Sequence, residues 1–138
     1  MSSVSLRYAK SEEDAIQKIN GGFLKILLKL KKYNGKHALA TWMRAILVHH
    51  IIDEYRKEKK YIASIHLTDF EEQDAAVSYN PAEADLGVKE LRAMLETLPE
   101  VTQKVFNLYA IDGYKHREIA ELLDISEGTS KWHVSDAR

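Results

Sequence analysis

The stretch EIAELLDISEGTSKWHV, residues 118–134, decides much of the fold of this chain. Residues 118–123 have the apolar spacing of a short helix, and Ile125 follows as an apolar residue in a tight turn. Ser126 is a good N-cap for a last helix that contains residues 129–138. Two short helices joined so closely, with the small Ala120 where they must approach each other, predict a helix-turn-helix.

The second helix of this motif carries side chains suited to DNA. A helix-turn-helix places that helix in the major groove with its first turns foremost. A lysine suits a phosphate or a guanine edge, and hydroxyls suit phosphates or bases. The residues predicted to contact DNA here are Thr129, Ser130, Lys131, His133 and Ser135. A helical hairpin that merely packs is the alternative interpretation.

Two further helices are expected before this motif. Residues 80–83, NPAE, look like a helix start with Asn80 as N-cap and Pro81 in the first turn. Pro99 ends this helix and opens the next, which stops at Asp112-Gly113. The apolar face of the first of these helices comprises Ala84, Val88, Leu91, Leu95 and Leu98. The buried side of the second comprises Val101, Val105 and Leu108.

The first half of the chain predicts two longer helices. One begins near Glu12, and Gly21-Gly22 within it indicates either a kink or a close contact with another helix. A turn at Asn34-Gly35 follows, and the second helix runs over residues 38–60. The apolar residues at helical spacing in the first helix are Ile16, Ile19, Phe23, Ile26 or Leu27, and Leu30. Those in the second are Leu39, Trp42, Met43, Ile46 and Leu47.

Charge is unevenly distributed along the chain, although the net charge is only −1. Residues 1–60 carry 13 basic and 6 acidic side chains, which gives +7, whereas residues 61–100 carry 2 and 9, which gives −7. A basic first segment indicates a polyanion or an acidic protein surface as partner, or else a solvated helix surface. Helical periodicity fades over residues 63–79, and this acidic stretch is interpreted as a flexible linker.

Composition and length narrow the class of protein. The 138 residues suffice for one ordinary domain or two very small ones. The absence of cysteine excludes disulfides and cysteine-based zinc sites and fits a reducing cytosol. No signal peptide or membrane-spanning stretch is recognisable, so a cytoplasmic protein without membrane attachment is expected. The expected fold is all-α: two small helical domains, at residues 1–62 and 80–138, joined by the linker at 63–79, with the helix-turn-helix in the second.

One constellation could hold a metal. His49-His50 with Asp53 and Glu54 places imidazoles and carboxylates one helical turn apart, a spacing that metal sites use. A third ligand is not evident, and a polar helix face explains these residues equally well. The sequence shows no glycine loop for phosphate and no nucleophile motif. An enzyme is therefore not expected, nor a catalytic residue, a metal or a cofactor; a metal-dependent helical enzyme built on His49, His50 and Asp53 is kept as an alternative.

Both helical blocks resemble the sigma factors of bacterial RNA polymerase. Residues 14–17, DAIQ, with 22–25, GFLK, resemble the polymerase-binding helix of conserved region two, and 40–42, ATW, with Asp53 and Arg56-Lys57 resemble its promoter-melting helix. Residues 98–138 resemble conserved region four, through LP at 98–99, DGYKHREIA at 112–120 and ISEGTSKWH at 125–133. The combination is similar to the small extracytoplasmic-function (ECF) type of the sigma-70 family. Relative to that family the chain starts late, so the first helix of region two is expected to be missing.

The resemblance implies a function, partners and site residues. A sigma factor directs RNA polymerase to promoters and aids DNA melting, so the implied partners are core RNA polymerase, promoter DNA at its −35 and −10 elements, and an anti-sigma factor. Asp14, Gln17 and Phe23 would lie on or beneath the polymerase-facing surface. The turn around residues 33–40 would capture an extruded base. The further residues implied to lie near DNA are Asn34, Arg44, Arg56, Lys57 and Arg117.

Trp42 and the region-four motif each have two interpretations. Trp42 on an amphipathic helix is expected to pack in the core, with stacking on unpaired bases as the alternative. The region-four motif is also shared by the output domains of response regulators. A helix-turn-helix transcription regulator of that kind is therefore the alternative function.

Overall fold

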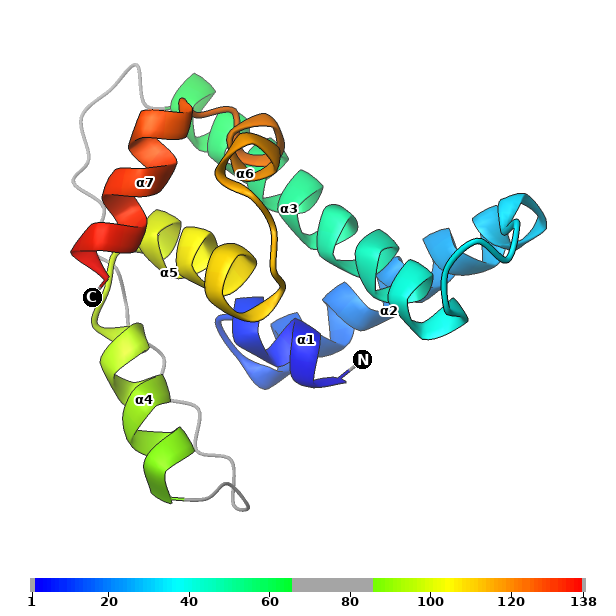
Figure 1. Ribbon diagram of the computed structural model, residues 1–138, viewed down its shortest axis with the longest axis horizontal. Coiled ribbons are helices and arrows are strands. Elements are labelled where there is room, and N and C mark those ends of the chain that lie inside the picture. The colour runs from blue at the N-terminus through cyan, green and yellow to red at the C-terminus, as the bar shows by residue number, and fades with distance from the viewer. Residues whose placement is uncertain (1, 66–85, 138) are drawn as a thin grey trace. The chain divides into compact units, whose positions relative to one another are not determined.

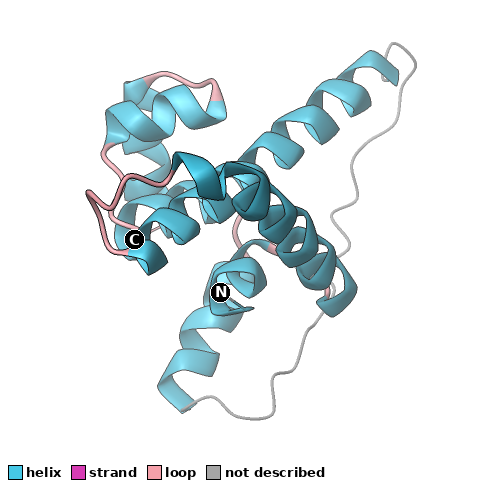
Figure 2. Ribbon diagram, turned by 90° about the vertical axis from the view of Figure 1, so that its right-hand side faces the viewer, coloured by secondary structure: helices cyan, strands magenta, loops and turns pink. Residues whose placement is uncertain are grey.

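A computed structural model describes residues 2–65 and 86–137, and all regular structure in these two ranges is helical (Figures 1 and 2). The chain divides into two compact units, Met1–Val77 and Ser78–Arg138. The first unit contains α1 (Ser2–Tyr8), α2 (Glu12–Lys29), the short 3-10 helix η1 (Leu30–Lys32) and α3 (Leu39–Ile65). The second contains α4 (Leu86–Glu96), α5 (Glu100–Phe106), the π-helical turn η2 (Asn107–Ile111), α6 (His116–Leu123) and α7 (Glu127–Asp136). The all-α prediction is confirmed, as is the helix-turn-helix, which α6 and α7 form.

Helix α2 begins at Glu12, as the sequence predicts. Ser11 caps it by accepting a hydrogen bond of 3.2 Å from the backbone N–H of Asp14. Three acidic residues, Glu12, Glu13 and Asp14, occupy the first turn, where negative charge interacts favourably with the helix dipole. The preceding helix α1 is not predicted from the sequence; its Val4 and Tyr8 are buried, and it packs against α2 and α3.

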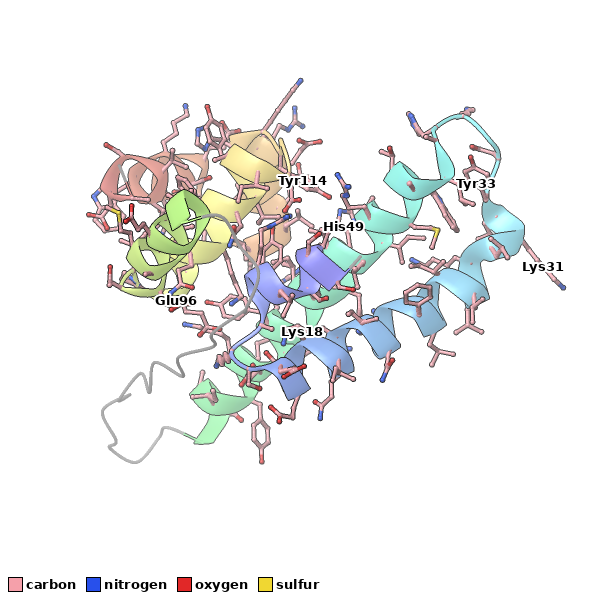
Figure 3. The ribbon with its side chains drawn as sticks, turned by 90° about the horizontal axis from the view of Figure 1, so that it is seen from below. Lys18, Lys31, Tyr33, His49, Glu96 and Tyr114 are labelled. Atoms are coloured by element: carbon pink, nitrogen blue, oxygen red, sulfur yellow. The ribbon has the colours of Figure 1, made fainter. Side chains whose placement is uncertain are left out.

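The glycine pair of α2 marks a close helix contact, not a kink. Helices α2 and α3 form a hairpin and lie side by side (Figures 1 and 3). A Cβ atom at Gly22 would clash with the side chain of Leu47, and one at Gly21 would clash with the ring of His50. Helix α2 continues without interruption past both glycines. Of the two readings of Gly21-Gly22, the close contact is therefore the one that the structure supports.

The core of the first unit lies further along α3 than the predicted stripe. Leu47, Ile51 and Ile52 have no exposed surface, whereas Leu39 is 44% exposed and Trp42 is only half-buried. Helix α3 also runs five residues beyond the predicted end at Lys60, to Ile65. The rest of the expected linker, residues 66–79, lies outside the described residues, as does the helix start expected at Asn80.

In α2 most of the predicted apolar stripe faces outward. Ala15, Gly22 and Ile26 are the buried residues of this helix. The exposed apolar side chains are Ile16, Phe23, Leu24, Leu27 and Leu28, continued by Leu30 in η1. They form what we call the outer strip of α2.

The second unit is built around α5 and η2. Val105 and Leu108 are fully buried, as predicted, together with Ile119 of α6. Gly113, with φ +76°, ends this segment in a conformation that glycine adopts without strain. On α4 the predicted apolar face is covered unevenly, since Leu91 is 51% exposed whereas Leu95 and Leu98 are half-buried.

The helix-turn-helix follows the prediction closely. Helix α6 starts two residues earlier than predicted, and the side chain of Glu118 accepts a hydrogen bond of 2.8 Å from the backbone N–H of Lys115. Asp124, in the left-handed conformation with φ 56°, ends it. Ser126 caps α7 and accepts a hydrogen bond of 3.0 Å from the backbone N–H of Thr129.

Candidate nucleic-acid and polymerase interfaces

The turn between η1 and α3, residues 33–38, is held in shape by its own side chains. The hydroxyl of Tyr33 donates a hydrogen bond to the carbonyl oxygen of His37. Asn34 Oδ1 accepts one of 3.1 Å from the backbone N–H of Lys36, and Gly35 turns the chain with φ +72°. The ring of Tyr33 also packs against Trp42, with 5.2 Å between ring centroids. The turn is therefore preorganised, which lowers the entropy lost when it binds a ligand.

Basic and aromatic side chains surround this turn. Among the exposed cations are Lys31, Lys32 and Lys36 before α3 and Arg44 within its first turns. Cations that follow a phosphate backbone, combined with aromatic faces for unstacked bases, form the typical surface for single-stranded nucleic acid. Asn34, predicted from the sequence, is exposed here, although its Oδ1 serves the turn itself.

The structure does not bring all the predicted DNA residues of the first unit together. Arg56 and Lys57 lie on α3, about 18 Å along the helix axis from Arg44. Arg56 is half-buried and Lys57 is exposed. They can contribute positive charge further along a bound strand, but they are separate from the cluster around the turn.

Trp42 joins the turn to α3. It is half-buried, and its ring partner is Tyr33 at the start of the turn. Because its ring is partly exposed, Trp42 can both pack against neighbouring side chains and contact bases. Its contact with Tyr33 means that packing by Trp42 supports the turn and not only the core.

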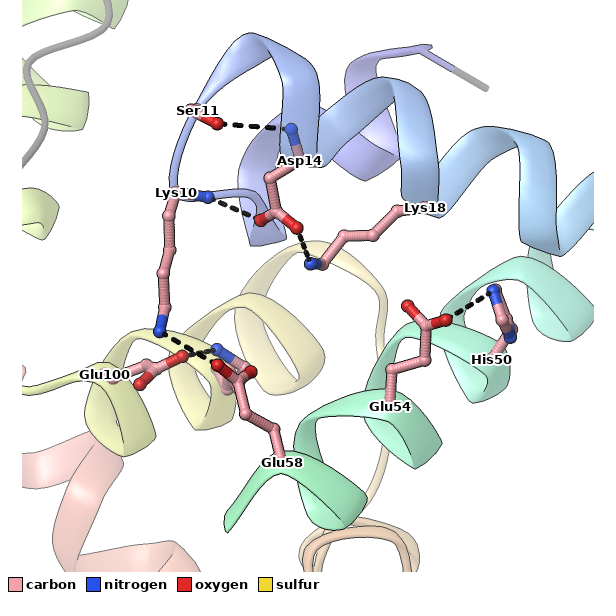
Figure 4. Close-up of polar contacts among 9 residues, drawn as sticks. Lys10, Ser11, Asp14, Lys18, His50, Glu54, Glu58 and Glu100 are labelled. Atoms are coloured by element: carbon pink, nitrogen blue, oxygen red, sulfur yellow. Dashed lines mark hydrogen bonds and ion pairs between the residues drawn. The ribbon is translucent and has the colours of Figure 1, made fainter. Parts of the chain in front are cut away.

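Asp14, predicted for the polymerase-facing surface, is an anchoring residue of α2. Its carboxylate accepts a hydrogen bond of 2.9 Å from the backbone N–H of Lys10 and pairs with Lys18 (Figure 4). Partial burial raises the pKa of Asp14, but the hydrogen bonds from Lys18 and Lys10 lower it more, so that the net pKa lies below the ordinary value. The carboxylate is thus ionised at neutral pH and fixes the start of the helix.

Gln17 and Phe23 are both exposed on α2. Phe23 belongs to the outer strip, and Gln17 lies beside it. Leu27 and Leu28 in this strip are 64% and 73% exposed. A row of exposed apolar side chains on a helix can bind another protein, because water is displaced favourably from it on binding. The sequence pattern predicted Ile16, Phe23 and Leu30 of this strip as apolar helix positions, but not Leu24 or Leu28, and it did not show that the strip faces solvent.

The adjacent residues His49 and His50 lie in different environments. His49 is exposed, whereas His50 is buried against the glycines of α2, with its Nε2 atom 3.4 Å from Glu54 Oε1 (Figures 3 and 4). Within residues 2–65 and 86–137, no three His, Cys, Asp or Glu side chains are grouped so that they could hold a metal ion.

In the second unit, α7 presents only some of the predicted side chains. Thr129, Lys131 and Ser135 are exposed. Ser130 is fully buried, and its Oγ atom lies 2.9 Å from His116 Nδ1, so this residue fixes α7 against α6. The prediction that Ser130 contacts DNA is corrected accordingly, because α7 turns this position inward.

His133 and Arg117 also have partners within the unit. His133 Nδ1 lies 2.9 Å from Thr102 Oγ1 of α5, and burial lowers the pKa of His133 against the opposing effect of Asp136. Arg117 is exposed and lies 3.6 Å from Glu121 on the same helix. An exposed pair of this kind contributes little to stability, so the guanidinium is available to a phosphate.

Trp132 was not recognised from the sequence as a functional residue. Its side chain is 59% exposed on α7, and its ring meets that of His133 edge-on, with 4.9 Å between centroids. No sequence pattern marks Trp132 as outward-facing, because the burial of Ser130 and Val134 on either side of it is apparent only in the structure.

Comparison with known proteins matches two separate regions of the chain. The family model for Sigma-70 region 2 matches residues 2–61, and that for Sigma-70, region 4 matches residues 89–138. The solved structure of the sigma factor RpoE in complex with the anti-sigma factor NepR from Bartonella quintana has a similar fold. Its TM-score is 0.62 at 19% sequence identity, and the match covers 99% of this chain and 84% of that one.

None of the helices in the described part of the chain is long and apolar enough to cross a bilayer. The chain matches region 2 and region 4 in the order in which sigma-70 proteins carry them. Regulators that share only the helix-turn-helix lack this combination. The chain therefore belongs to the sigma-70 family and acts as a sigma factor in transcription initiation, with core RNA polymerase and promoter DNA as its partners.

Proposed function

We propose that the outer strip of α2 binds core RNA polymerase, that the turn at residues 33–38 holds the opened −10 strand, and that α7 reads the −35 element. The observation that carries the proposal is the placing of two different surfaces on one helical hairpin. The strip is apolar, as protein contacts require, whereas the turn next to it is basic and aromatic, as single-stranded DNA requires.

The role of the turn follows from the cost of opening DNA. Extruding a base from the stack costs a few kcal/mol, which the protein must recover by contacts to the released base and strand. A turn that is already ordered by Tyr33, Asn34 and Gly35 loses little entropy on binding. Arg44, Lys36 of the turn, and Lys31 and Lys32 of η1 supply contacts to phosphates.

The other parts of the proposal follow from the family. The protein is a non-catalytic specificity subunit that works in the cytoplasm with the polymerase. A sigma factor of the same fold is known in complex with an anti-sigma factor, and we extend that class of partner to this chain. An anti-sigma factor that covered the outer strip would exclude the polymerase from it.

The decisive experiment is co-elution of the full chain with core RNA polymerase. Leu27→Glu places a charge in the middle of the strip, where burial in an interface is costly. We expect it to weaken polymerase binding by at least about tenfold, while circular dichroism shows an unchanged helix content. Tyr61→Glu is the matched control, because Tyr61 is an exposed apolar residue, 67% exposed, of the same unit outside the strip. Equal binding by both variants would contradict the proposal for α2.

A further inference from the structure

The register of α7 puts Trp132 at the centre of its outward face. Ser130 and Val134 face the interior of the unit. At 3.6 residues per turn, Trp132 lies about 160° around the helix from each of them, almost opposite the buried side. Gly128, one turn earlier, carries no side chain that could cover the indole. The largest side chain that α7 offers to a partner is therefore an exposed aromatic ring, 59% exposed.

Charge on α7 is too sparse to supply most of the affinity for DNA. Lys131 is opposed by Glu127 and Asp136 on this helix. Burial lowers the pKa of His133, so its imidazole is neutral at physiological pH despite the nearby Asp136. Phosphate contacts confer affinity without sequence preference in any case. A contact to a base edge that does not depend on charge is the remaining source of specificity.

We infer that Trp132 recognises a thymine in the −35 element by packing its indole against the thymine C5-methyl group. The inference rests on the proposed reading of DNA by α7. Thymine is the one base that presents an apolar group in the major groove, and apolar side chains contact that methyl. Lys131 and Ser135 flank Trp132 and serve the neighbouring phosphates or bases, so that the indole faces a base edge directly.

The test uses holoenzyme assembled from the full chain and core polymerase, on a duplex promoter that it transcribes. Each −35 thymine is replaced in turn by deoxyuridine, which removes only the methyl group. At one position we expect binding to weaken about fourfold, the value of one buried methyl-sized group. Trp132→Ala should bind the thymine and deoxyuridine promoters equally, and Trp132→Phe should retain part of the difference.

Two controls make the outcome specific. Lys131→Ala should keep the preference for thymine over deoxyuridine, and Trp132→Ala should elute with core polymerase as the wild type does. The inference is overturned if Trp132→Ala still distinguishes the two bases, or if it loses polymerase binding instead, which would assign Trp132 to a protein contact. If the wild type ignores the −35 sequence altogether, the proposed reading of DNA by α7 fails as well.

Discussion

His50 is a buried ionisable residue in the contact between α2 and α3. Neither of its ring nitrogens makes a hydrogen bond among the described residues, although Glu54 lies close by. Burial lowers the pKa of His50, Glu54 and Asp53 act in the opposite direction, and Lys25 and Lys18 lower it further. The lowered pKa therefore favours a neutral imidazole at the contact between α2 and α3.

A pH dependence of stability follows from that lowered pKa. Unfolded His50 binds a proton near its ordinary pKa of about 6.5, whereas the folded chain resists protonation. The stability that neutral His50 contributes is complete above that pH and is lost as the pH falls below it. We expect His50→Leu to reduce the drop in the free energy of unfolding between pH 7 and pH 5, measured by urea denaturation. His49→Leu, at the exposed neighbouring position, serves as control; an unchanged drop in His50→Leu would assign the effect to other groups.

We predict that the main role of Trp42 is to stabilise the turn and not to contact DNA. Truncating a fully buried Trp to Ala costs about 3–5 kcal/mol, but Trp42 is only half-buried, so its replacement should cost less. We expect Trp42→Leu, which keeps apolar packing and removes the stacking surface, to fold and to support open-complex formation. Thermal denaturation and permanganate footprinting of the opened promoter measure the two properties. A folded variant that cannot open the promoter would show that the ring contacts melted DNA.

The pair of helices α2 and α3 depends on the small residues between them. A methyl group at Gly22 overlaps the side chain of Leu47, and overpacking of this kind typically costs about 1–3 kcal/mol. We expect Gly22→Ala to lower the free energy of unfolding by that amount in urea denaturation. Gly87→Ala is the matched control, because a Cβ atom at this helical glycine meets nothing within 4 Å. That change should be neutral or stabilising by up to about 1 kcal/mol, since alanine favours helix; an equal loss in both variants would contradict the close contact.

We predict that Lys131 of α7 contributes to DNA binding through its charge, whereas Trp132 contributes through its shape. Lys131 is exposed and lies beside Trp132, at the edge of the outward face of α7. We expect Lys131→Ala to weaken holoenzyme binding for all −35 sequences alike and to reduce the salt slope of binding by about one. Affinities measured over a range of salt concentrations test this. A loss of discrimination at a single base pair, of about 1–3 kcal/mol, would show instead that Lys131 contacts a base edge.

The molecule as a whole carries a net charge of −1, which is low for a protein that binds DNA on its own. Its exposed apolar strip and its sparsely charged α7 favour a protein as the first partner. We expect the chain to bind core RNA polymerase more tightly than free promoter DNA, as measured by fluorescence anisotropy with each partner. Tight, sequence-specific binding of duplex DNA without affinity for polymerase would indicate an independent regulator.

The sequence alone determined the features that depend on local chemistry. The N-cap at Ser126, the turn at Asn34-Gly35 and the stop at Gly113 are interactions within a few residues, so the residue types suffice to predict them. The helices of the motif were predicted for the same reason, because the spacing of apolar residues distinguishes the apolar side of a helix from its polar side. The family resemblance needed only these motifs and their order.

The tertiary structure decided which side of each helix is covered. Helix α2 has two apolar sides, and its packing on α3 through the glycines buries Ala15 and Ile26 and leaves Phe23 and Leu27 in solvent. Helix α7 likewise turns Ser130 inward to His116 and Trp132 outward. Neither choice is encoded in the spacing of one helix, because the free energy of burial depends on the area that another element removes from water. The partner surface that removes this area comes from residues distant in the chain, so the exposed strip and the outward indole became visible only in the folded molecule.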